Sequence, residues 1–163
     1  MKRLACHTAI ISILAWSGAA LAAGGGDDPN VRGWGAAPVD STVQAAQTRF
    51  AAKDWSGAEE LLAKAIARSP QNADYHNLYA YSLRKGPNPN MDLVFRHYNE
   101  ALRINPKHVG AHEYLGEAYL MQNNLAKAKD HLSQLSQLCG RCDEFFMLRK
   151  AITDFEQGQA KRQ

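Results

Sequence analysis

The segment 112–119, His-Glu-Tyr-Leu-Gly-Glu-Ala-Tyr, followed by Ala128 and Leu132, decides the fold. Shifted by 36 residues, the chain places Ala80 on Gly116; shifted by 34, it places Val94 on Ala128. Further coincidences at 36 are Ala58 with Val94, Leu62 with Tyr98, Ala65 with Ala101, Pro70 with Pro106 and Leu83 with Tyr119; those at 34 are Tyr98 with Leu132 and Ala101 with Leu135. A period near 34 is typical of stacked helical hairpins, which bury their core between neighbouring repeats.

Helix start and stop signals divide the chain into consecutive helices. Residues such as Asp54, Asn90 and Asn124 precede amphipathic stretches, as N-cap residues do. The predicted helices span 41–52, 55–68, 72–85, 91–104, 108–122, 125–138 and 143–157. We therefore expect an all-α fold, an α-solenoid over 40–140 closed by a capping helix at 143–157. The three hairpins occupy about 39–72, 73–108 and 109–142, and 158–163 is expected to be disordered.

The change of offset locates an insertion. First helices of the second and third repeats are 36 residues apart, whereas their second helices are 34 apart. The two additional residues must therefore lie between the helices of the second repeat. That place is occupied by Gly86-Pro87-Asn88-Pro89-Asn90, a strong turn sequence.

The amino end has the layout of a secretory signal peptide. A basic start, Met1-Lys2-Arg3, precedes an apolar run that ends in Ala20-Leu21-Ala22, a small-residue cleavage site. We expect cleavage after Ala22 and a flexible Gly- and Pro-rich leader over 23–39. The expected location is therefore the periplasm or the exterior of the cell, with no membrane association after cleavage.

Charge and motifs exclude several classes of function. Loss of Lys2 and Arg3 lowers the net charge from +3 to +1 and leaves no basic run for nucleic acid. No phosphate loop or nucleophile elbow is present, so we expect no enzyme and no cofactor. His108 and His112 share one helical face, but an incidental pair is favoured over a metal site.

The repeats resemble the tetratricopeptide repeat family. Its pattern is an aromatic residue, Leu-Gly, Tyr, and then Ala, an aromatic residue and Pro at fixed gaps. The third repeat matches with Leu115, Gly116, Tyr119 and Ala128, while His112 stands in place of the usual Trp. The small or aromatic residues predicted to pack between helices are Ala58, Ala80, Ala101, Gly116, Tyr119 and Ala128.

The resemblance implies a concave groove lined by the first helix of each pair. The implied partner is another protein or a peptide segment, with no nucleic acid. Asn77 and Arg84 are expected to hold a peptide backbone or carboxylate; the multi-Lys/Arg clamp of chaperone-tail binders is absent. The family's groove positions fall on Val43, Gln47, Phe50, Asn77, Tyr81, Arg84, Lys85, Glu113, Glu117, Leu120 and Met121. A solvated helix face that binds nothing is the alternative.

Cys139 and Cys142 form a C-x-x-C pair between the sixth and seventh helices. An oxidising compartment favours a structural disulfide that fixes the capping helix. A redox-active dithiol remains open, because Arg141 and a helix amino end lower thiol pKa values. A haem site lacks its histidine, since Asp143 follows the pair, and a zinc site lacks further ligands.

Two functions follow from these patterns. The first is a non-catalytic interaction or adaptor module of the periplasm, which binds a protein segment in its groove. The alternative is a thiol–disulfide handling protein that uses Cys139 and Cys142 in an assembly pathway.

Overall fold

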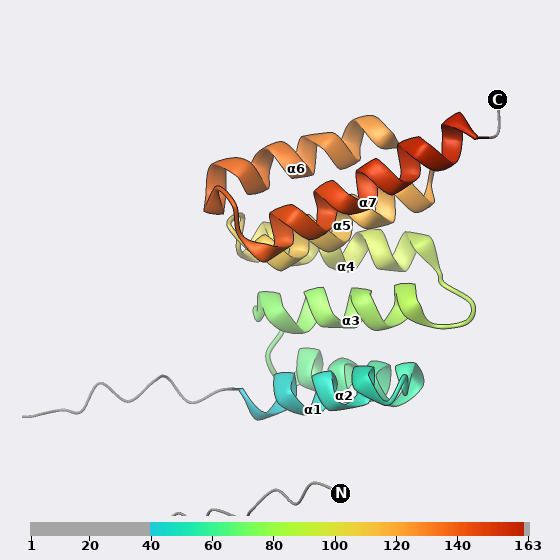
Figure 1. Ribbon diagram of the computed structural model, residues 1–163. Helices are drawn as coiled ribbons and strands as arrows, with labels where there is room; N and C mark the ends of the chain where they lie inside the picture. The colour runs from blue at the N-terminus through green and yellow to red at the C-terminus, as the bar shows by residue number, and fades with distance from the viewer. Residues whose placement is uncertain (1–39, 162–163) are drawn as a thin grey trace, which may run out of the picture. The chain divides into compact units, whose positions relative to one another are not determined.

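The computed structural model describes residues 40–161, and these form seven helices; α1 to α6 follow one another along the stack, and α7 returns to pack on both α5 and α6 (Figure 1). The all-α prediction is confirmed. The bounds are α1 (Ser41–Ala51), α2 (Trp55–Arg68), α3 (Ala73–Lys85), α4 (Met91–Ile104), α5 (Val109–Met121), α6 (Leu125–Cys139) and α7 (Asp143–Ala160).

The seventh helix is longer than the sequence indicates. Disorder was expected from residue 158, but α7 continues through Ala160, so that prediction is wrong for Gly158 to Ala160. Gln159 Nε2 donates a hydrogen bond to Asn123 Oδ1 over 3.3 Å, which ties this last turn to the connection between α5 and α6.

Polar side chains cap the first six helices, which begin at the predicted residue or, for α3 and α5, one residue later. Asp40 Oδ1 accepts hydrogen bonds from the Thr42 and Val43 amides at 2.8 and 3.2 Å. Such caps satisfy amide groups that have no partner within the helix. The other five caps are Asp54, Asn72, Asn90, His108 and Asn124.

The inserted turn lies between α3 and α4, as the offsets predict. Five residues, 86–90, connect these helices, whereas three residues connect α1 to α2 (52–54) and α5 to α6 (122–124). Each short connection contains one residue with a φ of 57°, Lys53 and Asn123. The two additional residues thus replace a tight left-handed turn by a wider one.

The core divides into three clusters along the stack. The first joins α1, α2 and α3, the second α3, α4 and α5, and the third α5, α6 and α7. Small residues sit at the helix crossings: Ala58, Ala80, Ala101 and Ala128 are fully buried. Tyr119 is half-buried and packs against the second and third clusters.

Gly116 lies where α5 meets the capping helix. A Cβ atom at this position would approach Leu148 Cδ2 to 2.6 Å, and Leu148 is fully buried. Glycine therefore lets α7 pack close to α5.

The predicted signal peptide (1–22) and leader (23–39) lie outside the described residues. Across residues 40–161, no helix combines the length and the apolar character that crossing a bilayer requires.

Replacing Gly116 by leucine should lower the free energy of unfolding by about 1–3 kcal/mol, because the new side chain overpacks the contact with Leu148. Urea denaturation measures the change. Gly158→Ala is the matched control, since no atom lies within 4 Å of an added Cβ there. Equal urea midpoints for Gly116→Leu and wild type would contradict the prediction and show that α7 shifts without loss of stability.

Candidate functional site

Aromatic rings from the first helix of each hairpin contact one another across α1, α3 and α5. The ring of Tyr81 lies 5.0 Å from Phe50 and 4.7 Å from Tyr114, measured between centroids. Trp55, at the start of α2, extends this row at 5.9 Å from Phe50. We call the surface formed by Phe50, Tyr81, Arg84, Glu113, Tyr114 and Glu117 the first-helix face.

Within this face, Arg84 joins three helices. Its Nη2 donates to Glu117 Oε2 at 2.7 Å, and its Nε donates to the hydroxyl of the fully buried Tyr98 at 3.2 Å. The guanidinium also lies 5.6 and 5.7 Å from the ring centroids of Tyr81 and Tyr114. Arg84 is only 7% exposed, so it holds the protein together rather than standing free to grip a ligand carboxylate.

Two buried polar groups on α3 and α5 lack partners. Asn77 is 4% exposed, and its Oδ1 atom accepts no hydrogen bond within residues 40–161. Glu113 is 8% exposed, and no described residue forms an ion pair or hydrogen bond with its carboxyl group. Burial, the Glu117 carboxylate and the Glu144 carboxylate raise the pKa of Glu113 to about 8.

The remaining predicted groove residues are spread over different surroundings. Lys85 is exposed, with Nζ 6.0 Å from the Tyr81 ring. Leu120 packs in the third core cluster instead of lining the first-helix face, because its position on α5 faces α6 and α7. Val43 packs against the first core cluster, whereas Gln47 and Met121 are exposed.

Sequence reasoning missed two histidine pairs inside the hairpins. His76 Nδ1 and His97 Nδ1 lie 2.9 Å apart, and His76 Nε2 lies 2.9 Å from the Pro70 carbonyl oxygen. The third repeat contains the same series of hydrogen bonds, which we call a histidine chain. His112 Nδ1 lies 3.0 Å from His131 Nδ1, and His112 Nε2 lies 3.0 Å from the Pro106 carbonyl oxygen. Each pair links the first helix of a hairpin to the second.

A carbonyl oxygen only accepts hydrogen bonds, so Nε2 of His76 must carry a proton. With both rings neutral, Nδ1 of His76 accepts and Nδ1 of His97 donates. Burial, followed by the neighbouring histidine, lowers the pKa of His97 and of His131 to about 4. The second ring of each pair is therefore neutral at pH 7.

The signal for these pairs was in the sequence. His76 and His112 are 36 residues apart, and His97 and His131 are 34 apart, the same two offsets that define the repeats. A pocket of about 280 Å³ lies over the first pair, lined by Pro70, Gln71, His76, Arg96, His97 and Glu100.

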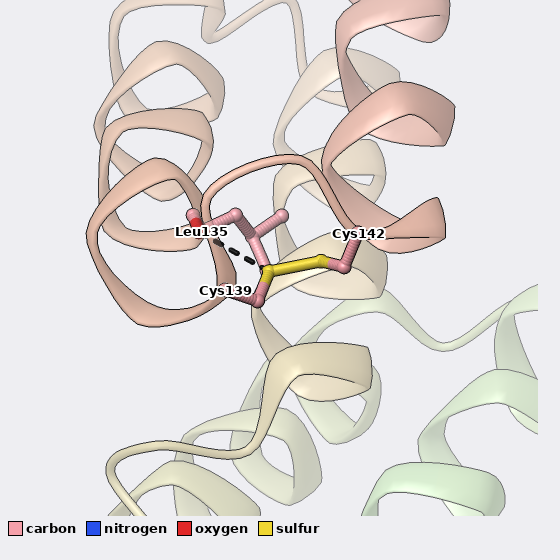
Figure 2. The surroundings of a disulfide bond; sticks show 3 residues. All are labelled: Leu135, Cys139 and Cys142. Carbon is pink, nitrogen blue, oxygen red and sulfur yellow. Dashed lines mark hydrogen bonds between the residues drawn. A yellow bond between two sulfur atoms is a disulfide. The ribbon is translucent and has the colours of Figure 1, made fainter.

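The predicted pairing of Cys139 with Cys142 is present as a disulfide between α6 and α7 (Figure 2). The Cys139 Sγ atom lies 3.2 Å from the Leu135 carbonyl oxygen, a packing contact, because an oxidised sulfur has no proton to donate. Gly140 between the cysteines has a φ of +69°, a conformation that glycine adopts without strain.

His108 and His112 do not converge on a common ligand. His108 Nδ1 accepts from the Ala111 amide to cap α5, and its Nε2 lies 3.1 Å from Asp74 Oδ1, whereas His112 belongs to its own pair. Among the residues that the structure describes, no three metal-ligating side chains come together.

Comparison with models of sequence families identifies the family of this chain. Two models of the tetratricopeptide repeat match the chain, one at residues 43–89 and the other at 97–130. The chain is a tetratricopeptide repeat protein. No match to a curated protein sequence was found.

Solved structures share the tetratricopeptide repeat fold at low identity. The type III secretion chaperone SycD of Yersinia enterocolitica, in complex with a peptide of the translocator YopD, is 15% identical, with a TM-score of 0.59 over 75% of this chain and 92% of that one. The first repeat domain of Spaghetti (RPAP3), bound to the HSP90 peptide SRMEEVD, is 17% identical, with a TM-score of 0.60 over 73% and 93%. The thermophilic repeat protein TTC0263 of Thermus thermophilus is 17% identical, with a TM-score of 0.61 over 72% and 63%.

Acid should destabilise this repeat protein through the histidine pairs. The unfolded chain binds protons at His97 and His131 near pH 6.5, whereas the folded chain binds them only near pH 4. The stability that their neutral forms contribute is complete above pH 6.5 and is lost as the pH falls towards 4. Urea midpoints between pH 7 and 4 measure this fall.

The double variant His97→Asn/His131→Asn is the control, because an asparagine keeps a donor near Nδ1 but does not titrate. Its midpoint should be lower at pH 7 and should fall less with acid. A wild-type decline that the double variant reproduces in full would assign the acid sensitivity to carboxylates instead.

Proposed function

We propose that this protein is a non-catalytic adaptor of the periplasm or cell exterior, which binds a segment of another protein on its first-helix face. The observation that carries the proposal is the row of half-buried rings from α1, α3 and α5, which continues across all three repeats. Aromatic residues are enriched where proteins bind one another.

An unpartnered acceptor on Asn77, one turn from Tyr81 on α3, supports binding at this surface. Asn77 Oδ1 is buried without a donor, and an unmet buried acceptor costs free energy that a bound N–H group would recover. An extended peptide supplies such groups along its backbone. SycD and RPAP3, with the same fold, have been solved with peptides bound, which favours a peptide as the ligand class.

The proposed location rests on the amino-terminal layout and on the disulfide. A basic start, an apolar run and a small-residue site mark export. The Cys139–Cys142 bond is of the kind that persists in oxidising compartments. In this proposal the bond fixes α7 against α6 and takes no part in thiol exchange.

A photo-crosslinking residue at position 81 tests the binding surface. Benzoylphenylalanine at Tyr81 should crosslink to a segment of one partner protein in the exporting cell, because Tyr81 lies in the middle of the aromatic row. Mass spectrometry of the conjugate identifies the segment.

The matched control places the same residue at Asn99, which is exposed on the second helix α4. Conjugates of the same kind from both positions, or none from position 81, would contradict binding on the first-helix face.

The proposed export also predicts the mass of the mature protein. Protein produced with its own amino end and recovered outside the cytoplasm should lack residues 1–22. Its mass should also lack the two thiol protons of Cys139 and Cys142. Intact mass spectrometry, before and after reduction, measures both changes. A chain that retains 1–22, or one that stays in the cytoplasm, argues against export.

A further inference from the structure

Carboxyl groups outnumber cations at one end of the first-helix face. Glu113 and Glu117 lie one turn apart on α5, and Glu144 in the first turn of α7 acts electrostatically on Glu113. The cation that acts on Glu113 is Arg84, which is already paired with Glu117 at 2.7 Å, while the exposed Lys85 has its Nζ 6.0 Å from the Tyr81 ring. A further positive charge would therefore be attracted to Glu113 without displacing an existing ion pair.

The hydrogen-bonding groups at this end show the same imbalance. Arg84 donates to Glu117 and to Tyr98. Asn77 Oδ1 is a buried acceptor without a described donor, and the Glu113 carboxyl group, on a residue that is 8% exposed, also has no described hydrogen-bond donor. Asn77 lies beside the first turn of α5, since its Nδ2 is 3.3 Å from the place that a Cβ of residue 110 would take. A ligand that fits must therefore bring donors.

The rings beside Glu113 suit a cation as well. Tyr81 and Tyr114, with centroids 4.7 Å apart, both lie within 6 Å of the Arg84 guanidinium. Aromatic faces attract ammonium and guanidinium groups electrostatically. Both rings are partly exposed, so a ligand can reach them.

We propose that this end of the face binds a lysine or arginine side chain of the partner segment, with the Glu113 carboxylate pairing the charge beside the rings of Tyr81 and Tyr114. The inference rests on the proposed peptide-binding function and names the chemistry of its ligand. An acidic residue at this place would meet the carboxylates of Glu117 and Glu144 and would give Glu113 no partner for a charge, so acidic segments should bind poorly.

A bare metal ion fits this end less well. Within residues 40–161, no three metal-ligating side chains converge. A lysine or arginine side chain needs only one carboxylate and an apolar wall for its methylene groups, and both are present.

The charge on Glu113 couples binding to pH. The groups that face it are Arg84 and Tyr81 on α3, Tyr114 and Glu117 on α5, and Glu144 on α7. Because the pKa of Glu113 is about 8 in the free protein, its carboxyl group is largely protonated at pH 7. A bound cation favours the carboxylate, so binding releases a proton, and affinity should rise between pH 6 and 8.

A random dodecapeptide library selected on the purified exported protein tests the proposal. Peptides that compete with the position-81 crosslink should share a lysine or arginine at one position. Glu113→Gln should weaken their binding by about tenfold or more, since it removes one partner of a buried charge pair. Replacing that lysine by norleucine should weaken wild-type binding equally and leave Glu113→Gln binding unchanged.

The control is Glu60→Gln, whose carboxylate is exposed on α2. It should leave affinity and its pH dependence unchanged, whereas Glu113→Gln should abolish the rise between pH 6 and 8. Because glutamine has nearly the shape of the protonated acid, the Glu113 variant should fold.

The possible outcomes distinguish a failure of this inference from a failure of the proposed peptide-binding function on which it rests. Selected peptides that compete at position 81 but lack a shared cation, or that bind Glu113→Gln as tightly as wild type, would overturn the inference and leave peptide binding intact. A selection that yields no peptide competing at position 81 would overturn the peptide-binding function and the inference with it.

Discussion

Close crossing of helices is the constraint on which the rest of this protein depends. At Ala58, Ala80 and Ala128 the side chain is one methyl group, fully buried, and at Gly116 there is none. These positions determine how near each helix comes to the next. The aromatic row depends on that spacing, because Tyr81 and Tyr114 sit on successive first helices and still meet at 4.7 Å. The geometry of the proposed binding surface thus depends on the helix packing beneath it.

Polar contacts add direction to this packing. Apolar burial is non-directional, whereas a hydrogen bond fixes which atoms face each other. Arg84 orients α3, α4 and α5 through Glu117 and Tyr98, and the histidine pairs orient the two helices within a hairpin. A buried ion pair is weak evidence for stability. The geometry of Arg84 indicates instead that it specifies one arrangement of the three helices.

The fold was predictable from the sequence because repeats restrict it strongly. The offsets of 36 and 34 located the hairpins and the inserted turn, and the caps at Asp54, Asn90 and Asn124 fixed helix starts. The candidate site was less predictable. The sequence predicted Arg84 as a groove residue, but only the packing shows that its guanidinium already donates hydrogen bonds to Tyr98 and Glu117. Tyr114 and Glu144 were missed for the same reason, because their contacts cross between helices.

The histidine hydrogen bonds give the segment 70–105, a block that contains α3 and α4, polar contacts of its own. Pro70, His76 and His97 all lie within residues 70–105, and the next block restarts the series at Pro106 with His112 and His131. No hydrogen bond of either histidine chain crosses from one block to the other. If the protein were lengthened by a second copy of 70–105, that copy would contain its own set of histidine hydrogen bonds. The contacts between blocks would have to be redesigned, both the apolar packing and the polar pairs that cross it, Arg84 with Glu117 and Asp74 with His108.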